Sequence, residues 1–158
     1  MLPFRIYPPY YVVKSNETCW KCGCTVPVFA LAASRSTAQI RGLELELPSC
    51  SPFFLTRIAS IPIAFLRVAV KSGANVELRR SGGCALRHYV NVCPCGATLG
   101  DHLVFKIPGH AFFPRSLADA ERVQVRRMNG PTTSALGDCR FIDRNLDLIF
   151  RKKGQILL

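Results

Sequence analysis

The chain lacks the sequence motifs that mark the common classes of enzyme. Its 158 residues contain no phosphate-binding glycine loop, no dinucleotide fingerprint and no Ser/His/Asp motif. The remaining candidates for acid–base or metal chemistry are Asp101 with His102, and the group Asp138, Asp143 and Asp147. Three carboxylates within ten residues, as in this group, usually lie in a solvated loop and at a strand edge, here with Arg140 and Arg144 as local partners. We therefore expect no enzymatic activity.

Long apolar runs are also missing. The most apolar stretch, residues 52–70, is interrupted by Arg57, Pro62 and Arg67, and the uncharged run between the two arginines is too short to cross a bilayer. Residues 1–9 lack a basic segment followed by an apolar run, which is the pattern of a secretory signal. These absences predict a cytoplasmic protein with no membrane partner, in a compartment where thiols stay reduced or bind metal.

Acidic residues are few. The chain has ten Asp and Glu residues and 21 Lys and Arg residues, which gives a formal net charge of +11. Such an excess attracts polyanions, whether nucleic acid or an acidic protein, and it also serves simply as a solvated surface that aids solubility. The excess is uneven, because residues 48–100 contain a single acid, Glu77, among several arginines and a lysine.

Cysteine, by contrast, is abundant and clustered. Two clusters are each closed by a glycine: Cys19-Trp-Lys-Cys22-Gly and Cys93-Pro-Cys95-Gly. A zinc knuckle needs a tight turn that points two thiolates at one place, and glycine supplies the positive φ that such a turn often requires. We predict that Cys19, Cys22, Cys93 and Cys95 bind one Zn²⁺ ion. A closed four-cysteine site is structural, whereas a catalytic zinc site keeps an open position.

This ligand set has alternatives, because the second cluster has one residue between its cysteines and the first has two. Cys24, His88 and His102 are the substitute ligands. A redox role for the first pair is disfavoured, since a thioredoxin-like pair opens a helix, whereas glycine and β-branched residues follow Cys22. The isolated cysteines are interpreted as small buried hydrophobic side chains: Cys50, Cys84 and Cys139.

Hydrophobic patterns predict an α+β fold that is mostly antiparallel β-sheet, with a zinc-ribbon-like pair of knuckles and one amphipathic helix. Apolar alternation and β-branched or aromatic residues predict strands around and after the knuckles. These strands are expected at residues 10–13, 25–30, 43–47, 88–92, 103–107, 122–128 and 145–151. No linker divides the chain, so residues 1–158 are predicted to form a single domain.

The apolar residues of 54–71 recur with a helical period and predict one amphipathic helix that lies on the sheet. Ser60 is expected to cap this helix and Gly73 to end it. Residues 32–42 are expected to form an exposed loop. The leucines of 43–47 alternate with glutamates, which predicts a strand with one buried face.

Three segments together carry a resemblance to a known family. They are Cys19-Trp-Lys-Cys-Gly, Tyr89-Val-Asn-Val-Cys-Pro-Cys-Gly-Ala-Thr-Leu-Gly-Asp101 and Pro108-Gly-His-Ala-Phe-Phe-Pro114. This layout resembles a family of bacterial split zinc-ribbon proteins of unknown function, in which a second Cys-x-x-Cys-Gly precedes a Gly-Asp pair and a Phe-Phe-Pro-like element. The resemblance covers residues 10–30 and 85–150. It implies that the four knuckle cysteines are zinc ligands, and it carries no activity.

The basic surface leads to the functional hypothesis, which is nucleic-acid binding, because Lys and Arg neutralise phosphates. Trp20, at the tip of the first knuckle, and Tyr89 are candidates for stacking on bases, although Trp20 is also expected to pack over the metal site. The alternative is a zinc-stabilised protein–protein interaction module with an acidic partner. The candidate phosphate contacts are Arg79, Arg80, Arg126, Arg127, Arg151, Lys152 and Lys153.

Overall fold

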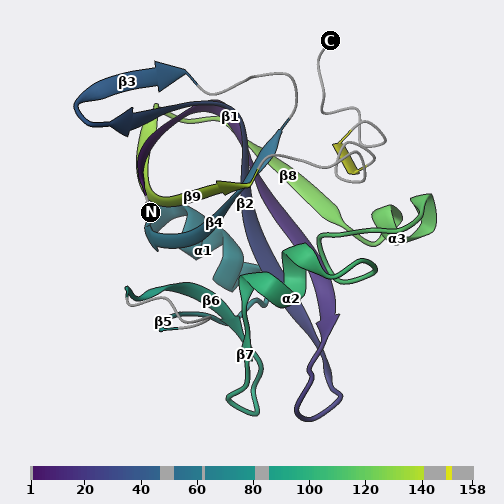
Figure 1. Ribbon diagram of the computed structural model, residues 1–158. Helices are drawn as coiled ribbons and strands as arrows, with labels where there is room; N and C mark the ends of the chain where they lie inside the picture. The colour runs from purple at the N-terminus through teal and green to yellow at the C-terminus, as the bar shows by residue number, and fades with distance from the viewer. Residues whose placement is uncertain (1, 47–51, 62, 81–85, 141–148, 151–158) are drawn as a thin grey trace.

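The computed structural model describes residues 2–46, 52–61, 63–80, 86–140 and 149–150. Most of these residues lie in two antiparallel sheets (Figure 1). The larger sheet consists of β1 (Leu2–Thr18), β2 (Thr25–Ile40), β3 (Leu43–Glu46), β4 (Phe53–Ser60), β8 (Gln124–Met128) and β9 (Thr133–Arg140). The smaller sheet consists of β5 (Val76–Arg79), β6 (His88–Val92) and β7 (Thr98–Leu99). The helices are α1 (Ile63–Lys71), α2 (Asp101–Lys106) and α3 (Leu117–Glu121).

The β1–β2 hairpin is the centre of the larger sheet. The two strands pair along most of their length, from Phe4 opposite Ala38 to Thr18 opposite Thr25. On its other side β1 pairs with β9 through its first half and with β8 through its second half. Because β2 also pairs with β4, and β4 with β9, the sheet closes on itself through β1, β2, β4 and β9 (Figure 1).

Both faces of this hairpin are buried. Tyr11 and Val13 lie in one apolar cluster with the aromatic rings of α2 and the loop after it, while Val12 lies in a second cluster with Phe65 of α1. Successive side chains of a strand point to opposite faces, so the run of apolar residues in β1 serves both clusters. Removal of this surface from water is the main favourable term in folding.

Several predicted elements are confirmed. The sheet is mostly antiparallel, and strands run through residues 10–13, 25–30 and 88–92 and through most of 122–128. Residues 32–42 are not an exposed loop as predicted, since β2 continues to Ile40 and Ala32 and Ala33 are fully buried. Small residues in this segment hid the strand, because alanine contributes little to apolar alternation.

The single helix predicted over 54–71 is also wrong. Its first half is β4, where Phe54 is buried in one apolar cluster and Leu55 in the other, so a strand buried on both faces produced the apolar run. The helix in this region is the shorter α1, and Ser60 is the last residue of β4 and not the N-cap of the helix. Gly73 follows the helix with φ +84° and its N–H donates to Val70, as expected for a C-terminal turn.

The strand predicted at 103–107 is wrong as well, because α2 occupies this segment and buries the adjacent Val104 and Phe105. β3 is a strand as expected, but it lacks the predicted buried face: Leu43 and Leu45 are 66% and 46% exposed. Of the strand predicted at 145–151, only Ile149 and Phe150 fall within the described residues, and they have helical backbone and are buried.

No helix in the described part of the chain combines the length and apolar character needed to span a membrane. The described residues of the apolar stretch 52–70 are divided mainly between β4 and α1.

Candidate metal centre

The two cysteine clusters meet in space. The first forms the turn between β1 and β2, and the second forms the turn between β6 and β7, so that two hairpin ends lie side by side (Figure 1). Cys19 and Cys93 are buried, whereas Cys22 and Cys95 are exposed. The structure therefore brings together all four cysteines predicted from the sequence.

Each turn is built by its glycine. Gly23 has φ +74° and Gly96 has φ +84°, in the left-handed region that glycine adopts without steric cost. The N–H of Cys19 donates to the carbonyl of Cys24 at 2.9 Å. In the second turn the N–H of Cys93 donates to the carbonyl of Ala97, also at 2.9 Å. The second knuckle is shorter by one residue yet closes in the same way, so its shorter spacing does not move its cysteines out of position.

The sulfur positions fit a tetrahedral metal. The Sγ atoms of Cys19 and Cys95 are 3.7 Å apart, those of Cys22 and Cys93 are 3.6 Å apart, and all four lie within 4.8 Å of one another. Metal–sulfur bonds of about 2.3 Å at tetrahedral angles place sulfurs about 3.8 Å apart. Disulfide sulfurs are only about 2.05 Å apart, so the cluster consists of free thiols. This arrangement is compatible with a structural metal site.

Ionisation within the cluster is uneven. Burial opposes ionisation of Cys19, but hydrogen bonds from the backbone of Cys22 and Lys21 and from neighbouring thiols outweigh it and lower the pKa of Cys19 to about 6. For Cys93 the backbone N–H of Cys95 favours the thiolate, but burial and the surrounding thiols raise the pKa to about 12. Four crowded sulfurs cannot all ionise unless a cation joins them, which is the condition that a metal ion satisfies.

The substitute ligands lie outside this group in the described structure. Cys24 is exposed and contributes only its backbone carbonyl to the first turn. His88 is buried, with its Nδ1 3.4 Å from the carbonyl of Leu86, and His102 is exposed on α2. Cys50 and Cys84, and the side chain of Cys139, lie outside the described residues.

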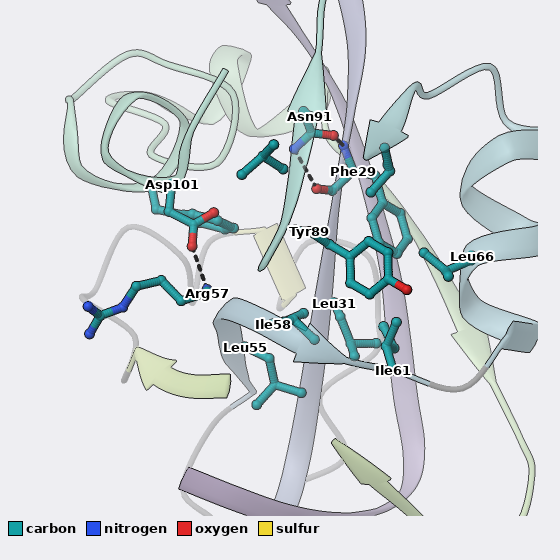
Figure 2. Close-up of a pocket in the computed structure, with 14 residues that line it drawn as sticks. Phe29, Leu31, Leu55, Arg57, Ile58, Ile61, Leu66, Tyr89, Asn91 and Asp101 are labelled. Carbon is teal, nitrogen blue, oxygen red and sulfur yellow. Dashed lines mark hydrogen bonds between the residues drawn. The ribbon is translucent and has the colours of Figure 1, made fainter. Parts of the chain in front are cut away.

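Asn91 joins the smaller sheet to the larger one beside the second knuckle (Figure 2). Its amide oxygen accepts from the N–H of Phe29 at 2.8 Å, and its amide nitrogen donates to the carbonyl of the same residue at 3.0 Å. The side chain thus supplies both hydrogen bonds that a neighbouring strand would supply to Phe29, and it is 6% exposed. This contact fixes β6, and with it Cys93, against the strand that follows the first knuckle.

Two further side chains brace the knuckles from outside. The indole N–H of Trp20 donates to the carbonyl of Thr98 at 3.0 Å, so Trp20 bridges the two hairpin ends although the residue is 67% exposed. Arg79 donates to the carbonyl of Gly96 at 2.9 Å and forms an ion pair with Glu77. Arg79, predicted as a phosphate contact, is therefore engaged at the second knuckle.

A buried carboxylate supports the first knuckle. Glu17 is 6% exposed and accepts hydrogen bonds from the N–H groups of Thr18 and Ala111, both at 2.9 Å. It also contacts Nδ1 of His110 at 3.0 Å. These contacts anchor the loop between α2 and α3 to the end of β1. No sequence pattern pointed to Glu17, because its partners lie far along the chain.

Asp101 and Asp138 both contact Arg57 at an irregular point of β4, so Asp138 is not the solvated acid that was predicted. Arg57 has φ +48°, an uncommon conformation for a non-glycine residue, and its N–H donates to Asp101 (Figure 2). Its guanidinium pairs with Asp138. Burial raises the pKa of Asp101, although the Arg57 N–H opposes this shift. Asp143 and Asp147 lie outside the described residues.

The remaining predicted phosphate contacts are dispersed. Arg80 is exposed just after β5, in the smaller sheet, whereas Arg126 and Arg127 are exposed on β8, in the larger one. Tyr89 is half-buried and packs against the second apolar cluster. The basic run at residues 151–153 lies outside the described residues.

Comparison with protein-family models, with curated proteins and with solved structures found no match to this chain.

Proposed function

We propose that this protein is a zinc-stabilised protein that binds nucleic acid through its basic surface. The four-cysteine cluster supports the metal part, because four soft thiolate ligands in tetrahedral arrangement select zinc over hard cations such as magnesium. The site has no open position among its ligands, so its role is to hold two hairpins together and not to perform chemistry.

One observation carries the nucleic-acid part. Arg80 and Arg126 are exposed, and neither of them forms an ion pair with an acid within the described ranges. In a chain of net charge +11, such unpaired cations attract phosphates and release their counterions on binding.

Binding of the zinc-loaded full chain to fluorescein-labelled DNA and RNA tests this function. We expect affinity that falls linearly with the logarithm of the salt concentration, the mark of phosphate neutralisation. A chain that shows no affinity for either nucleic acid at low salt does not have this function.

The β2–β3 hairpin favours a second candidate function, a protein–protein interaction module. Ile40 and Leu43 lie opposite each other in the β2–β3 ladder, and Leu45 is opposite Ala38, so the three larger residues form an exposed apolar patch. Contiguous exposed apolar residues mark interaction sites more often than isolated ones do. Capture of a partner from cell extract that survives nuclease treatment and is lost in Leu43→Asp favours this alternative.

A further inference from the structure

A groove lined by basic residues lies between α1, β1 and β8. Lys14 of β1, Lys71 of α1 and Arg126 of β8 line it, with Val12 and Val68 as apolar walls. The groove has a volume of about 220 Å³, and none of the described residues that line it is acidic. Three cations from distant parts of the chain therefore converge on one hollow.

The strand register explains this convergence. Arg126 lies directly opposite Val12, and Lys14 directly opposite Gln124, so all four side chains share one face of the sheet. Lys14 and Arg126 are diagonal neighbours, a relation that places Cβ atoms about 7–8 Å apart. Helix α1 covers the same face and adds Lys71 at its last turn.

Lys14 is fixed at this position. Its ammonium donates to the carbonyl of Ser72, just beyond the end of α1, where the helix exposes unpaired carbonyl groups. An ammonium has three N–H donors, so this bond leaves two for another acceptor. Lys71 and Arg126 are exposed, and neither has an acidic partner among the residues described.

Like charges placed together on one sheet face cost stability, and no carboxylate among the described lining residues offsets this cost. A low-dielectric hollow lined by charge of one sign concentrates the field and attracts a ligand of opposite charge. We propose that this groove binds the phosphodiester backbone of a nucleic acid strand, with Lys14, Lys71 and Arg126 as its phosphate contacts. The proposal rests on the proposed nucleic-acid function and assigns that function to one face of the molecule.

The neighbouring arginine supplies a matched control. Arg127 lies opposite Tyr11, whose ring is in the apolar cluster on the other face of the sheet. Arg126 and Arg127 are therefore adjacent, chemically identical and both exposed, but only Arg126 lines the groove. Arg126 and Arg127 were both predicted as phosphate contacts, but successive side chains of a strand point to opposite faces, so the two lie on opposite faces of the sheet.

The test is the salt dependence of binding to a fluorescein-labelled mixed-sequence single-stranded DNA, measured by anisotropy with zinc-loaded full-length chain. Each phosphate contact contributes about 0.7 to the slope of log K against log salt for a single strand. The double variant Lys71→Gln/Arg126→Gln should lower the magnitude of the slope by about 1.4 and weaken binding. Arg127→Gln should leave the slope unchanged.

The outcomes separate this inference from the function on which it rests. If the wild-type chain binds DNA and the double variant keeps its slope, or Arg127→Gln lowers the slope by about 0.7 as the loss of a phosphate contact would, the groove assignment is overturned and the function stands. If the wild-type chain binds no DNA but binds poly-glutamate through Lys71 and Arg126, both are overturned in favour of an acidic protein partner. Lys14 is left unchanged because its bond to Ser72 supports the fold, and thermal unfolding checks that each variant is folded.

Discussion

Replacement of Asn91 tests how much this one side chain contributes to holding the smaller sheet against the larger one. Asn91→Ala removes both hydrogen bonds to Phe29 and leaves a buried N–H and a buried carbonyl without partners. Each unsatisfied buried group costs about 1–3 kcal/mol, so the free energy of unfolding should fall by about 2–6 kcal/mol. Because the total stability of a domain is about 5–15 kcal/mol, this is a large fraction of it.

Asn91→Asp adds a pH dependence that a general packing defect would not produce. The ionised carboxylate still accepts from the Phe29 N–H, but it cannot donate to the Phe29 carbonyl, and it is a buried charge beside an acceptor. Its folded pKa must therefore lie above the unfolded value of about 3.9. The folded state then binds more protons, so stability is greatest at low pH and is lost as pH rises through the folded pKa.

Urea unfolding of zinc-loaded protein, followed by circular dichroism, measures both effects. Asn75→Ala is the matched control, because Asn75 is exposed and its side chain makes one long contact, at 3.3 Å, with Glu77. A loss of less than about 0.5 kcal/mol in Asn91→Ala, the range of ordinary surface substitutions, would refute the reasoning. So would an Asn91→Asp variant whose stability does not change with pH.

Three other predictions follow from the site and its surroundings. The variants Cys19→Ser and Cys93→Ser should each lose zinc, as measured by elemental analysis, whereas Cys24→Ser should retain it. If both Cys19→Ser and Cys93→Ser retained zinc, the ligand set would be contradicted. Gly96→Ala should lower the free energy of unfolding by about 1–2 kcal/mol and Gly96→Asn by less, because Gly96 has φ +84° and an added Cβ would meet no atom within 4 Å. Equal urea midpoints for the two variants would contradict a backbone origin of the effect. Burial raises the pKa of Asp101, so the free energy of unfolding of the wild-type chain should fall as pH rises above 3.8. The variant Asp101→Asn keeps an acceptor for the Arg57 N–H but cannot ionise, so its free energy of unfolding, measured over the same pH range, should decline less.

The sequence predicted the cysteine cluster because knuckle chemistry is local. A glycine after each cysteine pair specifies the turn, and flanking β-branched residues specify the strands, so both features appear within a few positions. The meeting of the two turns could also be anticipated, because four thiolates in two pairs imply one shared ion. The identity of that ion and the role of the molecule remain predictions.

The errors arose where burial depends on distant partners. Phe53 to Leu55 form a strand because both faces of β4 are covered, a fact that no window of the sequence contains. Leu43 and Leu45 alternate like a half-buried strand, yet β3 lies at the end of the sheet and nothing in the described structure covers them. Asn91 and the basic groove are invisible in sequence for the same reason, since each depends on residues brought together only by the register.

The separation of the two knuckles along the chain also sets the time at which a complete metal site can exist. The paired sulfurs belong to residues 71 and 76 positions apart, so each hairpin end alone offers a metal only two or three thiols. Closing a loop of that length costs about 4 kcal/mol in chain entropy, and contacts between the two sheets must offset this cost before the four cysteines can come together. At a synthesis rate of about 5–20 residues per second, the second cysteine pair is synthesised about 4–14 s after the first. A site with four ligands can therefore form only late, after the tertiary structure has brought the two hairpin ends together.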